Sequence, residues 1–302
     1  MLLERISLKP IDWLLLVWVI AFCPLQLGAK GKAHTSWKLQ GGIGVCASIG
    51  NVEKLLEAKS AFVEVIIQNF FNPYESDSAF ASKMEQAKRY SLPLYSGNCF
   101  FPGKMKLTGG QLDVQGVLDY AEIAMRRAHM AGTKIFVLGS GGARNIPEGF
   151  DRKRAEEQFV GLCKRIAEIG EKYGIVLVLE PLRKEETNFI HTVKEALEFV
   201  KAVNHPYFKV LADFYHMACE KESPESIVEA ADELYHCHIA EVEVRSAPGV
   251  KGDDFTPYFK ALKQIGYKGA IALECNWKDF DKEVECGVAE TEKQAASVSD
   301  FD

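Results

Sequence analysis

Short apolar runs alternate with longer amphipathic segments over most of the chain, and this alternation constrains the fold more than any other feature. The short runs are rich in Val, Ile, Leu and Phe. Most are apolar throughout, which is typical of strands covered on both faces of a parallel sheet. The predicted strands are Ile43–Ala47, Phe62–Ile67, Leu92–Ser96, Lys134–Leu138, Ile175–Leu179, Phe208–Ala212, Leu234–Ile239 and Ala270–Leu273.

The segments between these strands carry apolar residues at three- and four-residue spacing, as amphipathic helices do. Strands and helices that alternate without a linker predict an α/β protein with a single (β/α)8 barrel, a TIM barrel. We expect the barrel to span residues 30–288 and residues 289–302 to form a loosely packed polar tail. The predicted helices are Val52–Ala58, Ser78–Tyr90, Gln111–Ala131, Arg152–Tyr173, Thr192–Ala202, Pro224–Ala231 and Pro257–Ile265.

The first 29 residues differ in composition from the rest. Arg5 and Lys9 precede an apolar run that ends before Gly28-Ala29, an arrangement typical of a secretory signal peptide. The run is short for a membrane span, which needs about 20 residues. We expect a cleaved signal peptide and an exported protein, periplasmic or extracellular, with no stable membrane span. Two alternatives stay open. The segment could be an uncleaved anchor, or it could result from an upstream start codon, in which case the protein would be cytoplasmic.

The composition favours a small polar substrate over a nucleic acid. The 302 residues carry a net charge of −6, and the basic stripe typical of a phosphate-binding surface is missing from the sequence. Of the eight cysteines, Cys23 lies in the predicted signal peptide and the other seven are widely scattered. Their odd number and spacing indicate neither a disulfide framework nor a zinc knuckle.

Four consecutive predicted strands, from the fifth onward, bring an acidic residue or a histidine to their carboxyl ends. These residues are Glu180, Asp213, His238 and Glu274. Because active sites of such barrels lie at the carboxyl ends of the strands, all four are expected on one rim. Each has an ordinary explanation by itself, as a helix cap or a core histidine. Together, converging carboxylates would repel one another and resist burial unless a cation neutralised them.

Three carboxylates and one imidazole make an oxygen-rich site that favours Mn²⁺, with Co²⁺, Mg²⁺ or Zn²⁺ as alternatives. His236 shares a strand face with His238, but His238 lies nearer the rim and is the preferred ligand. Glu186, His216 and Arg245 follow in the loops, where they could bind sugar hydroxyl groups or simply be surface charges.

The sequence here resembles a known family. Glu180-Pro-Leu-x-x-x-Glu186, Asp213-x-x-His216-Met, His236-x-His238-x-x-Glu241 and Glu274 are similar to motifs of the ketose 3-epimerase branch of the xylose-isomerase-like barrels, which includes tagatose and psicose epimerases. The segment 138–150 also resembles a loop of proteins called sugar phosphate isomerase/epimerase. The resemblance covers about residues 43–285.

The resemblance implies a divalent-metal-dependent isomerase or epimerase that acts on a ketose or related keto-sugar through an enediolate. It implies that Glu180 and Glu274 are the catalytic acid–base pair, and that Asp213 and His238 are ligands only. Glu186, His216 and Arg245 would position the substrate oxygens.

One residue departs from the epimerase pattern. The epimerases place their arginine six residues after the ligand histidine, whereas Val244 occupies that position here and Arg245 follows it. A one-residue insertion before Pro248 would reconcile the two spacings.

Other functions on the same barrel stay open. An exported member could act on 3-keto-glycosides as a lyase or hydrolase with the same metal and base. An abasic-site endonuclease would need more histidine ligands than this rim supplies, and the acidic charge opposes DNA binding. A non-catalytic sugar-binding barrel would have no use for two opposed glutamates. Related barrels often form dimers or tetramers, so a homo-oligomer is a further expectation.

Overall fold

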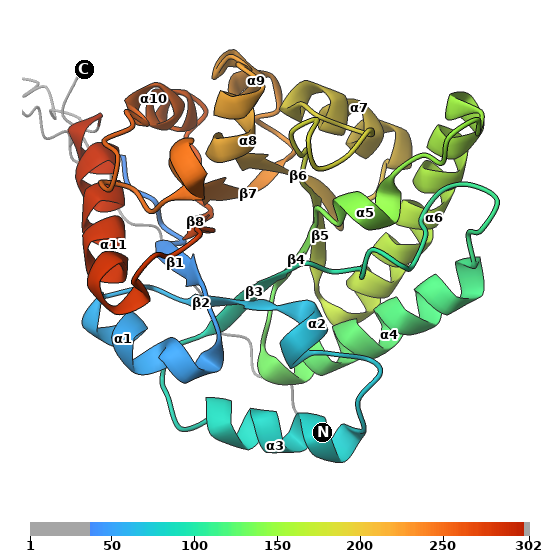
Figure 1. Ribbon diagram of the computed structural model, residues 1–302, viewed down its shortest axis with the longest axis horizontal. Coiled ribbons are helices and arrows are strands. Elements are labelled where there is room, and N and C mark those ends of the chain that lie inside the picture. Colours follow the sequence, from blue (N-terminus) through green and yellow to red (C-terminus); the bar gives the residue numbers. More distant parts are fainter. Residues whose placement is uncertain (1–36, 299–302) are drawn as a thin grey trace, which may run out of the picture. The chain divides into compact units, whose positions relative to one another are not determined.

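A closed barrel of eight parallel strands forms the centre of the protein (Figure 1). The computed structural model describes residues 37–298, so the predicted signal peptide, residues 1–29, lies outside the described residues. Each strand pairs with its neighbours in sequence, and β1 pairs with β8 to close the ring. The strands are β1 Ile43–Cys46, β2 Val63–Ile66, β3 Leu94–Asn98, β4 Ile135–Leu138, β5 Val176–Leu179, β6 Phe208–Asp213, β7 Leu234–Ile239 and β8 Ala270–Leu273.

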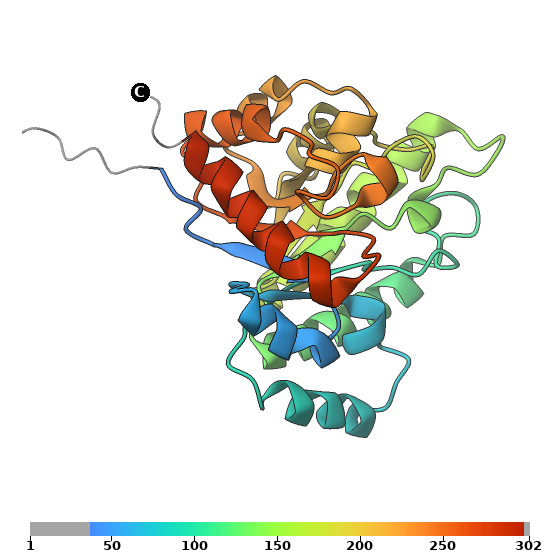
Figure 2. The same ribbon diagram turned by 60° about the vertical axis from the view of Figure 1, so that its left-hand side comes forward.

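Helices follow the strands and cover the outside of the barrel (Figures 1 and 2). The helices that connect one strand to the next are α1 Val52–Glu57, α3 Asp77–Ala87, α4 Val114–Ala131, α6 Arg152–Tyr173, α7 Val193–Val203, α9 Glu225–Glu229 and α10 Thr256–Gln264, and α11 Phe280–Ser297 follows the last strand. Short elements lie after the strand ends: η1 Ile49–Asn51, α2 Ile67–Phe70, α5 Gly141–Arg144, α8 Phe214–Cys219 and η2 Glu243–Arg245. The predicted barrel fold is therefore confirmed.

The interior of the barrel has an apolar part and a polar part. Side chains alternate between the two faces of a strand, so every second residue of each strand points inward. Near the amino ends of the strands the interior is apolar, with Phe62 against Ala270 and Ala272. Gly44 makes room there, since a Cβ at this position would lie 2.2 Å from the Phe62 ring. Toward the carboxyl ends, the inward-facing positions carry polar side chains. The groups that could bind a ligand or transfer a proton therefore lie at one rim.

The C-terminal prediction was wrong for residues 289–297, which form the second half of α11 rather than a loose tail. Thr291 and Ala295 are buried there, and the Thr291 hydroxyl donates a hydrogen bond to the carbonyl of Gly287 (2.8 Å). The residues that face the barrel are small, so their helical spacing produces only a weak hydrophobic pattern in the sequence.

Within residues 37–298, none of the helices is both long and apolar enough to cross a membrane. All seven cysteines of this part of the chain are free, as the sequence indicated. Cys163 and Cys237 are buried and pack as small apolar residues.

The start of α7 generates a prediction about stability. The Thr192 hydroxyl accepts a hydrogen bond from the Glu195 amide (3.1 Å), and the Glu195 carboxylate accepts one from the Thr192 amide (3.3 Å), a capping box. Thr192→Ala is expected to lower the free energy of unfolding by about 1 kcal/mol. Urea denaturation should show a lower midpoint with an unchanged slope, and Thr192→Ser should stay close to the wild type. Equal midpoints for the two variants would contradict the cap.

Candidate active site and metal centre

The four rim residues predicted from the sequence converge in the structure. Glu180 follows β5, Asp213 ends β6, His238 lies in β7 and Glu274 follows β8. One donor atom from each lies within 4.8 Å of the others. We call these four residues the rim cluster. Strands β5 and β8 are three places apart in the ring of eight (Figure 1). Glu180 and Glu274, which follow these strands, therefore approach the cluster from different sides.

His238 lies between the two glutamates. Its Nδ1 is 3.2 Å from Glu180 Oε1 and 3.1 Å from Glu274 Oε2. The Arg245 guanidinium contacts two carboxylates of the cluster. Its Nη2 lies 2.9 Å from Asp213 Oδ2 and is also in contact with Glu274 Oε2. Glu180, Asp213 and His238 are buried, and Glu274 is partly buried. Buried carboxylates are thus balanced by cationic groups at hydrogen-bonding distance.

The two glutamates have opposite pKa shifts. Burial and the nearby charge of Glu274 raise the pKa of Glu180 above its usual value of 4.5. Burial also opposes ionisation of Glu274, but the charges of Arg245 and His238 outweigh it and lower the pKa of Glu274 to about 2. The Glu64 and Glu274 carboxylates likewise overcome the effect of burial on His238 and raise its pKa well above 6.5.

The donor set fits a divalent cation. Three carboxylates and one imidazole nitrogen are ligands that Mn²⁺, Mg²⁺ or Co²⁺ accept, and Zn²⁺ also binds such groups. Asp213 is held in place because its Oδ1 accepts a hydrogen bond from the Tyr215 amide (2.9 Å), which leaves Oδ2 facing the cluster. Asn98 Nδ2 similarly donates to Glu274 Oε1 (2.7 Å). Oriented ligands of this kind are what a metal site requires.

Glu64 is a functional neighbour that the sequence analysis missed. It lies inside the barrel on β2, fully buried, with Oε1 2.9 Å from His238 Nε2 and Oε2 2.9 Å from His236 Nε2. His236 therefore lies deeper and pairs with Glu64, while His238 alone joins the rim cluster, as preferred from its position. A carboxylate on the far nitrogen fixes the orientation of a ligand histidine. The available signal was a lone charged residue within the apolar run Phe62–Ile67.

The three predicted substrate-binding residues are placed differently. His216 is buried, its Nδ1 accepts a hydrogen bond from the Arg183 amide (3.2 Å), and its Nε2 lies 3.5 Å from Asp213 Oδ2. That Nε2 has no hydrogen-bond partner among residues 37–298, so a donor faces the cluster unused. Glu186 is exposed, and its carboxylate binds Arg183 Nε (2.9 Å) instead of entering the cluster.

The 241–253 loop carries Arg245 to the cluster. Glu241 is fully buried and accepts hydrogen bonds from the amides of Gly249 (2.8 Å), Lys251 (2.5 Å) and Gly252 (2.9 Å). It therefore ties the far end of the loop to the end of β7. Arg245 also lies over the Tyr215 ring at 4.7 Å, a cation–π contact that fixes the guanidinium from the side.

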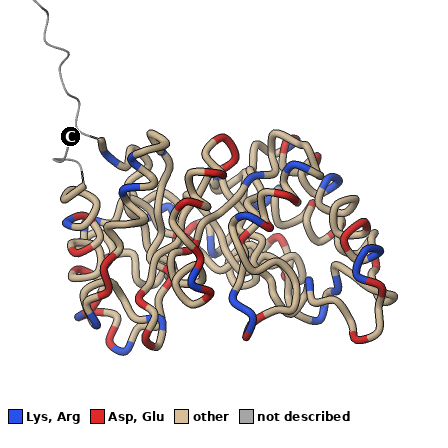
Figure 3. Tube along the Cα trace, turned by 90° about the horizontal axis from the view of Figure 1, so that it is seen from above, with Lys and Arg blue, Asp and Glu red and all other residues tan. Residues whose placement is uncertain are grey.

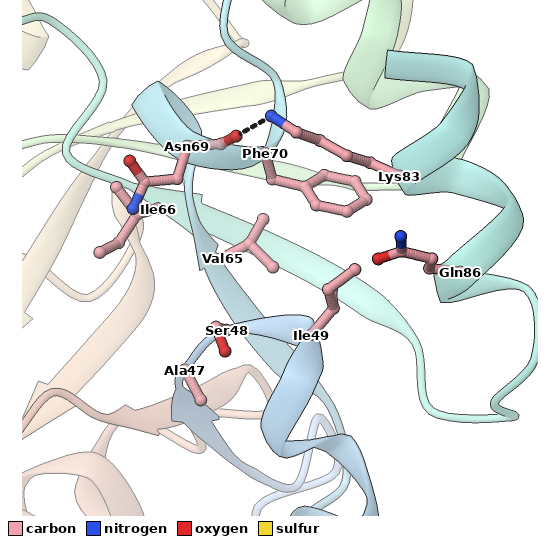
Figure 4. A pocket seen from close by; sticks show the side chains of 9 residues that line it. All are labelled: Ala47, Ser48, Ile49, Val65, Ile66, Asn69, Phe70, Lys83 and Gln86. Atoms are coloured by element: carbon pink, nitrogen blue, oxygen red, sulfur yellow. Dashed lines mark hydrogen bonds between the residues drawn. The ribbon is translucent and has the colours of Figure 1, made fainter. Parts of the chain in front are cut away.

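A groove of about 230 Å³ lies beside the barrel mouth between the ends of β1 and β2 and the helices α2 and α3 (Figure 4). Its lining is mostly apolar, and its one charged side chain, Lys83, is engaged by the carbonyl of Asn69 and by Glu75 (2.5 Å). None of the predicted site residues lines it, so the groove offers no acid–base chemistry. Acidic and basic residues are interspersed along the trace in Figure 3.

Comparison with known proteins identifies the family. A family model described as a xylose isomerase-like TIM barrel matches residues 52–298. The chain belongs to this family. An L-ribulose 3-epimerase of Methylomonas sp. is 37% identical over 116 residues, which are 38% of this chain and 40% of that protein. A D-psicose 3-epimerase of Agrobacterium fabrum is 34% identical over 232 residues, 74% of this chain and 77% of its own length.

The first of these relatives is matched over less than half of its length, and the second over about three quarters. Among solved structures, a D-allulose 3-epimerase from Methylomonas sp. in complex with D-allulose aligns with a TM-score of 0.74. The identity is 21%, and the alignment covers 86% of this chain and 99% of that one, so this likeness shows the shared fold.

Arg245 lies in an unusual stretch of backbone in this xylose isomerase-like barrel. Val244 and Arg245 both have φ of 54°, in the left-handed region that residues other than glycine rarely adopt. With these two residues in succession in that region, the Arg245 side chain contacts Asp213 and Glu274 of the rim cluster. Val244 is left exposed on the outside of the turn.

The β4 loop of this barrel generates a prediction about cation binding. A Cβ on Gly139 would lie 2.2 Å from Glu180 Oε2, whereas a Cβ on Gly142, in the short helix α5 that follows, would meet only the Gly103 Cα at 3.4 Å. Gly139→Ala should therefore displace the Glu180 carboxylate and weaken Mn²⁺ binding about 10- to 100-fold, the usual effect of disturbing a ligand's support. Titration calorimetry checks this. Gly142→Ala is the matched control, and equal affinities for the two variants would contradict the placement of Glu180.

Proposed function

We propose that this protein is a divalent-metal-dependent ketose epimerase or isomerase that moves a proton between two glutamates. The observation that carries the proposal is the placement of Glu180 and Glu274, which lie on either side of His238 in the rim cluster. The names of the relatives support the same reaction class, since they are ketose 3-epimerases. One solved neighbour, which shares the fold, holds D-allulose.

The rim cluster would hold the cation, with Mn²⁺ as the expected ion and Co²⁺, Mg²⁺ or Zn²⁺ as alternatives. When bound, a divalent cation would polarise the carbonyl of the sugar and make the neighbouring C–H bond more acidic. Asp213 and His238 would only bind the cation and fix its position. Glu180 and Glu274 would also transfer protons, because they follow different strands, β5 and β8, and both reach the cluster.

The reaction is a proton transfer on each side of one carbon. Glu274, which is ionised, takes the proton from the carbon next to the carbonyl. The C–H electron pair forms the carbon–carbon double bond of the enediolate, and the carbonyl π electrons move onto the carbonyl oxygen. Glu180, the glutamate with the raised pKa, starts with a proton and gives it to the opposite face of that carbon, and the double-bond electrons form the new C–H bond as the carbonyl is restored. The configuration is inverted, and the reverse reaction exchanges the two roles. General acid–base transfer of this kind contributes about 10²- to 10⁴-fold to the rate.

Other residues would orient the sugar. The unused His216 Nε2 can donate to a substrate oxygen next to Asp213. Arg245 can donate to a second oxygen while its contacts with Asp213 and Glu274 fix its position. Glu186 would reach the substrate only by leaving Arg183, so we assign it to the outer end of the sugar.

The substrate we propose is a free, unphosphorylated ketose. Residues 1–29 have the composition of a signal peptide, and sugar phosphates are mainly cytosolic metabolites. We accordingly propose that the mature enzyme acts outside the cytoplasm.

Deuterium exchange tests the reaction. The protein is stripped with a chelator, resupplied with Mn²⁺ and incubated with a panel of ketoses in D₂O. Uptake of deuterium at the carbon next to the carbonyl is expected only with the metal. Glu180→Gln and Glu274→Gln should each lower the uptake about 100-fold or more, because each removes one of the two proton carriers.

Glu185→Gln is the matched control, an exposed glutamate on the same loop as Glu186, and it should exchange like the wild type. Bound Mn²⁺ without uptake from any free ketose would overturn the epimerase proposal and favour a 3-keto-glycoside substrate. Failure to bind any divalent cation would overturn the metal centre itself.

A further inference from the structure

A second set of possible metal ligands lies directly beneath the rim cluster. Cys46 Sγ, a carboxylate oxygen of Glu64 and a ring nitrogen of His238 lie within 4.8 Å of one another. Cys46 Sγ is 3.1 Å from Glu64 Oε1, and His238 Nε2 is 2.9 Å from the same oxygen. The three donors come from the inward faces of β1, β2 and β7.

Glu64 is held in the orientation that such a site needs. Its Oε2 is occupied by the Ser96 hydroxyl (2.5 Å) and by His236 Nε2 (2.9 Å). Its Oε1 is therefore the oxygen left to face Cys46 and His238. This is the support that a metal-ligating carboxylate usually receives from its surroundings.

His238 supplies the second observation. The side chain is fully buried, and although Nε2 lies close to Glu64, it forms no properly oriented hydrogen bond with any of residues 37–298. A buried ring nitrogen that lies beside a carboxylate without a hydrogen bond, with a thiol sulfur within 4.8 Å, has the surroundings of a ligand.

We propose that Cys46, Glu64 and His238 form a separate site for a thiophilic divalent cation such as Zn²⁺ or Cd²⁺. A thiolate, an imidazole and a carboxylate select such ions over Mn²⁺ or Mg²⁺, which prefer the oxygen-rich rim cluster. Binding would release the thiol proton of Cys46 to solvent and form the metal–sulfur bond in its place.

The two sites exclude each other because they use the two nitrogens of one ring. A neutral imidazole binds a metal through one nitrogen and keeps its proton on the other. With a cation at the rim cluster, Nδ1 is the ligand and Nε2 carries the proton toward Glu64. With a thiophilic ion below, Nε2 is the ligand and the proton moves to Nδ1, which can then no longer hold the rim ion. A thiophilic metal would thus inhibit by removing one ligand of the catalytic ion.

The claim that the two sites exclude each other rests on the metal centre proposed above, whereas the claim that the thiolate site exists does not. One titration tests the two claims separately. Cd²⁺ is added to the purified protein while the ultraviolet absorption of cadmium–thiolate bonds is recorded. We expect a band that saturates at one equivalent, is lost in Cys46→Ser and persists in Cys99→Ser. Cys99 is the matched control because it is an exposed thiol that follows β3.

Unfolding midpoints of the two variants close to that of the wild type show that loss of the band does not reflect misfolding. Mn²⁺ at about ten times its dissociation constant should raise the Cd²⁺ concentration at half-saturation about tenfold, as competition requires. No band, or one that survives Cys46→Ser, would overturn the site. A band that forms equally well with saturating Mn²⁺ would overturn the exclusion. The readout needs no turnover, so it does not depend on the epimerase activity.

Discussion

Negative charge concentrated inside the barrel is the constraint on which the rest of the site depends. Glu64, Glu180, Asp213 and Glu274 lie within one small volume, most of it shielded from water. A buried carboxylate is tolerated only when a partner of opposite charge and well-placed hydrogen bonds compensate its lost hydration.

His236, His238 and Arg245 provide that compensation from β7 and the loop behind it. Every group at the rim is therefore coupled to several others. A change at one of them alters the proton affinities and orientations of the rest, so no single residue of the centre acts independently.

The sequence was sufficient for the fold and for the rim cluster, because both depend on position along each strand. Buried parallel strands produce apolar runs, and whatever follows such a run must emerge at the carboxyl rim, which located Glu180, Asp213 and Glu274. Glu64 could not be located in this way because it lies in the middle of a strand and not at its end. Its partner His236 is 172 residues away in the sequence. The position of Arg245 could not be predicted because it depends on a left-handed backbone conformation. The end of α11 could not be predicted because its buried residues are small and give only a weak hydrophobic pattern.

Glu241 preorganises the 241–253 loop in the absence of a ligand. Its buried carboxylate accepts hydrogen bonds from four backbone amides at the far end of the 241–253 loop, so the loop is ordered when the protein folds. Fixing a backbone residue costs about 1–2 kcal/mol of conformational entropy. That cost is met during folding, so the proposed binding of a small sugar, which has few atoms to offset it, does not have to bear it. The affinity of the barrel mouth for the ligand we propose would thus depend partly on Glu241, a fully buried side chain outside the rim cluster.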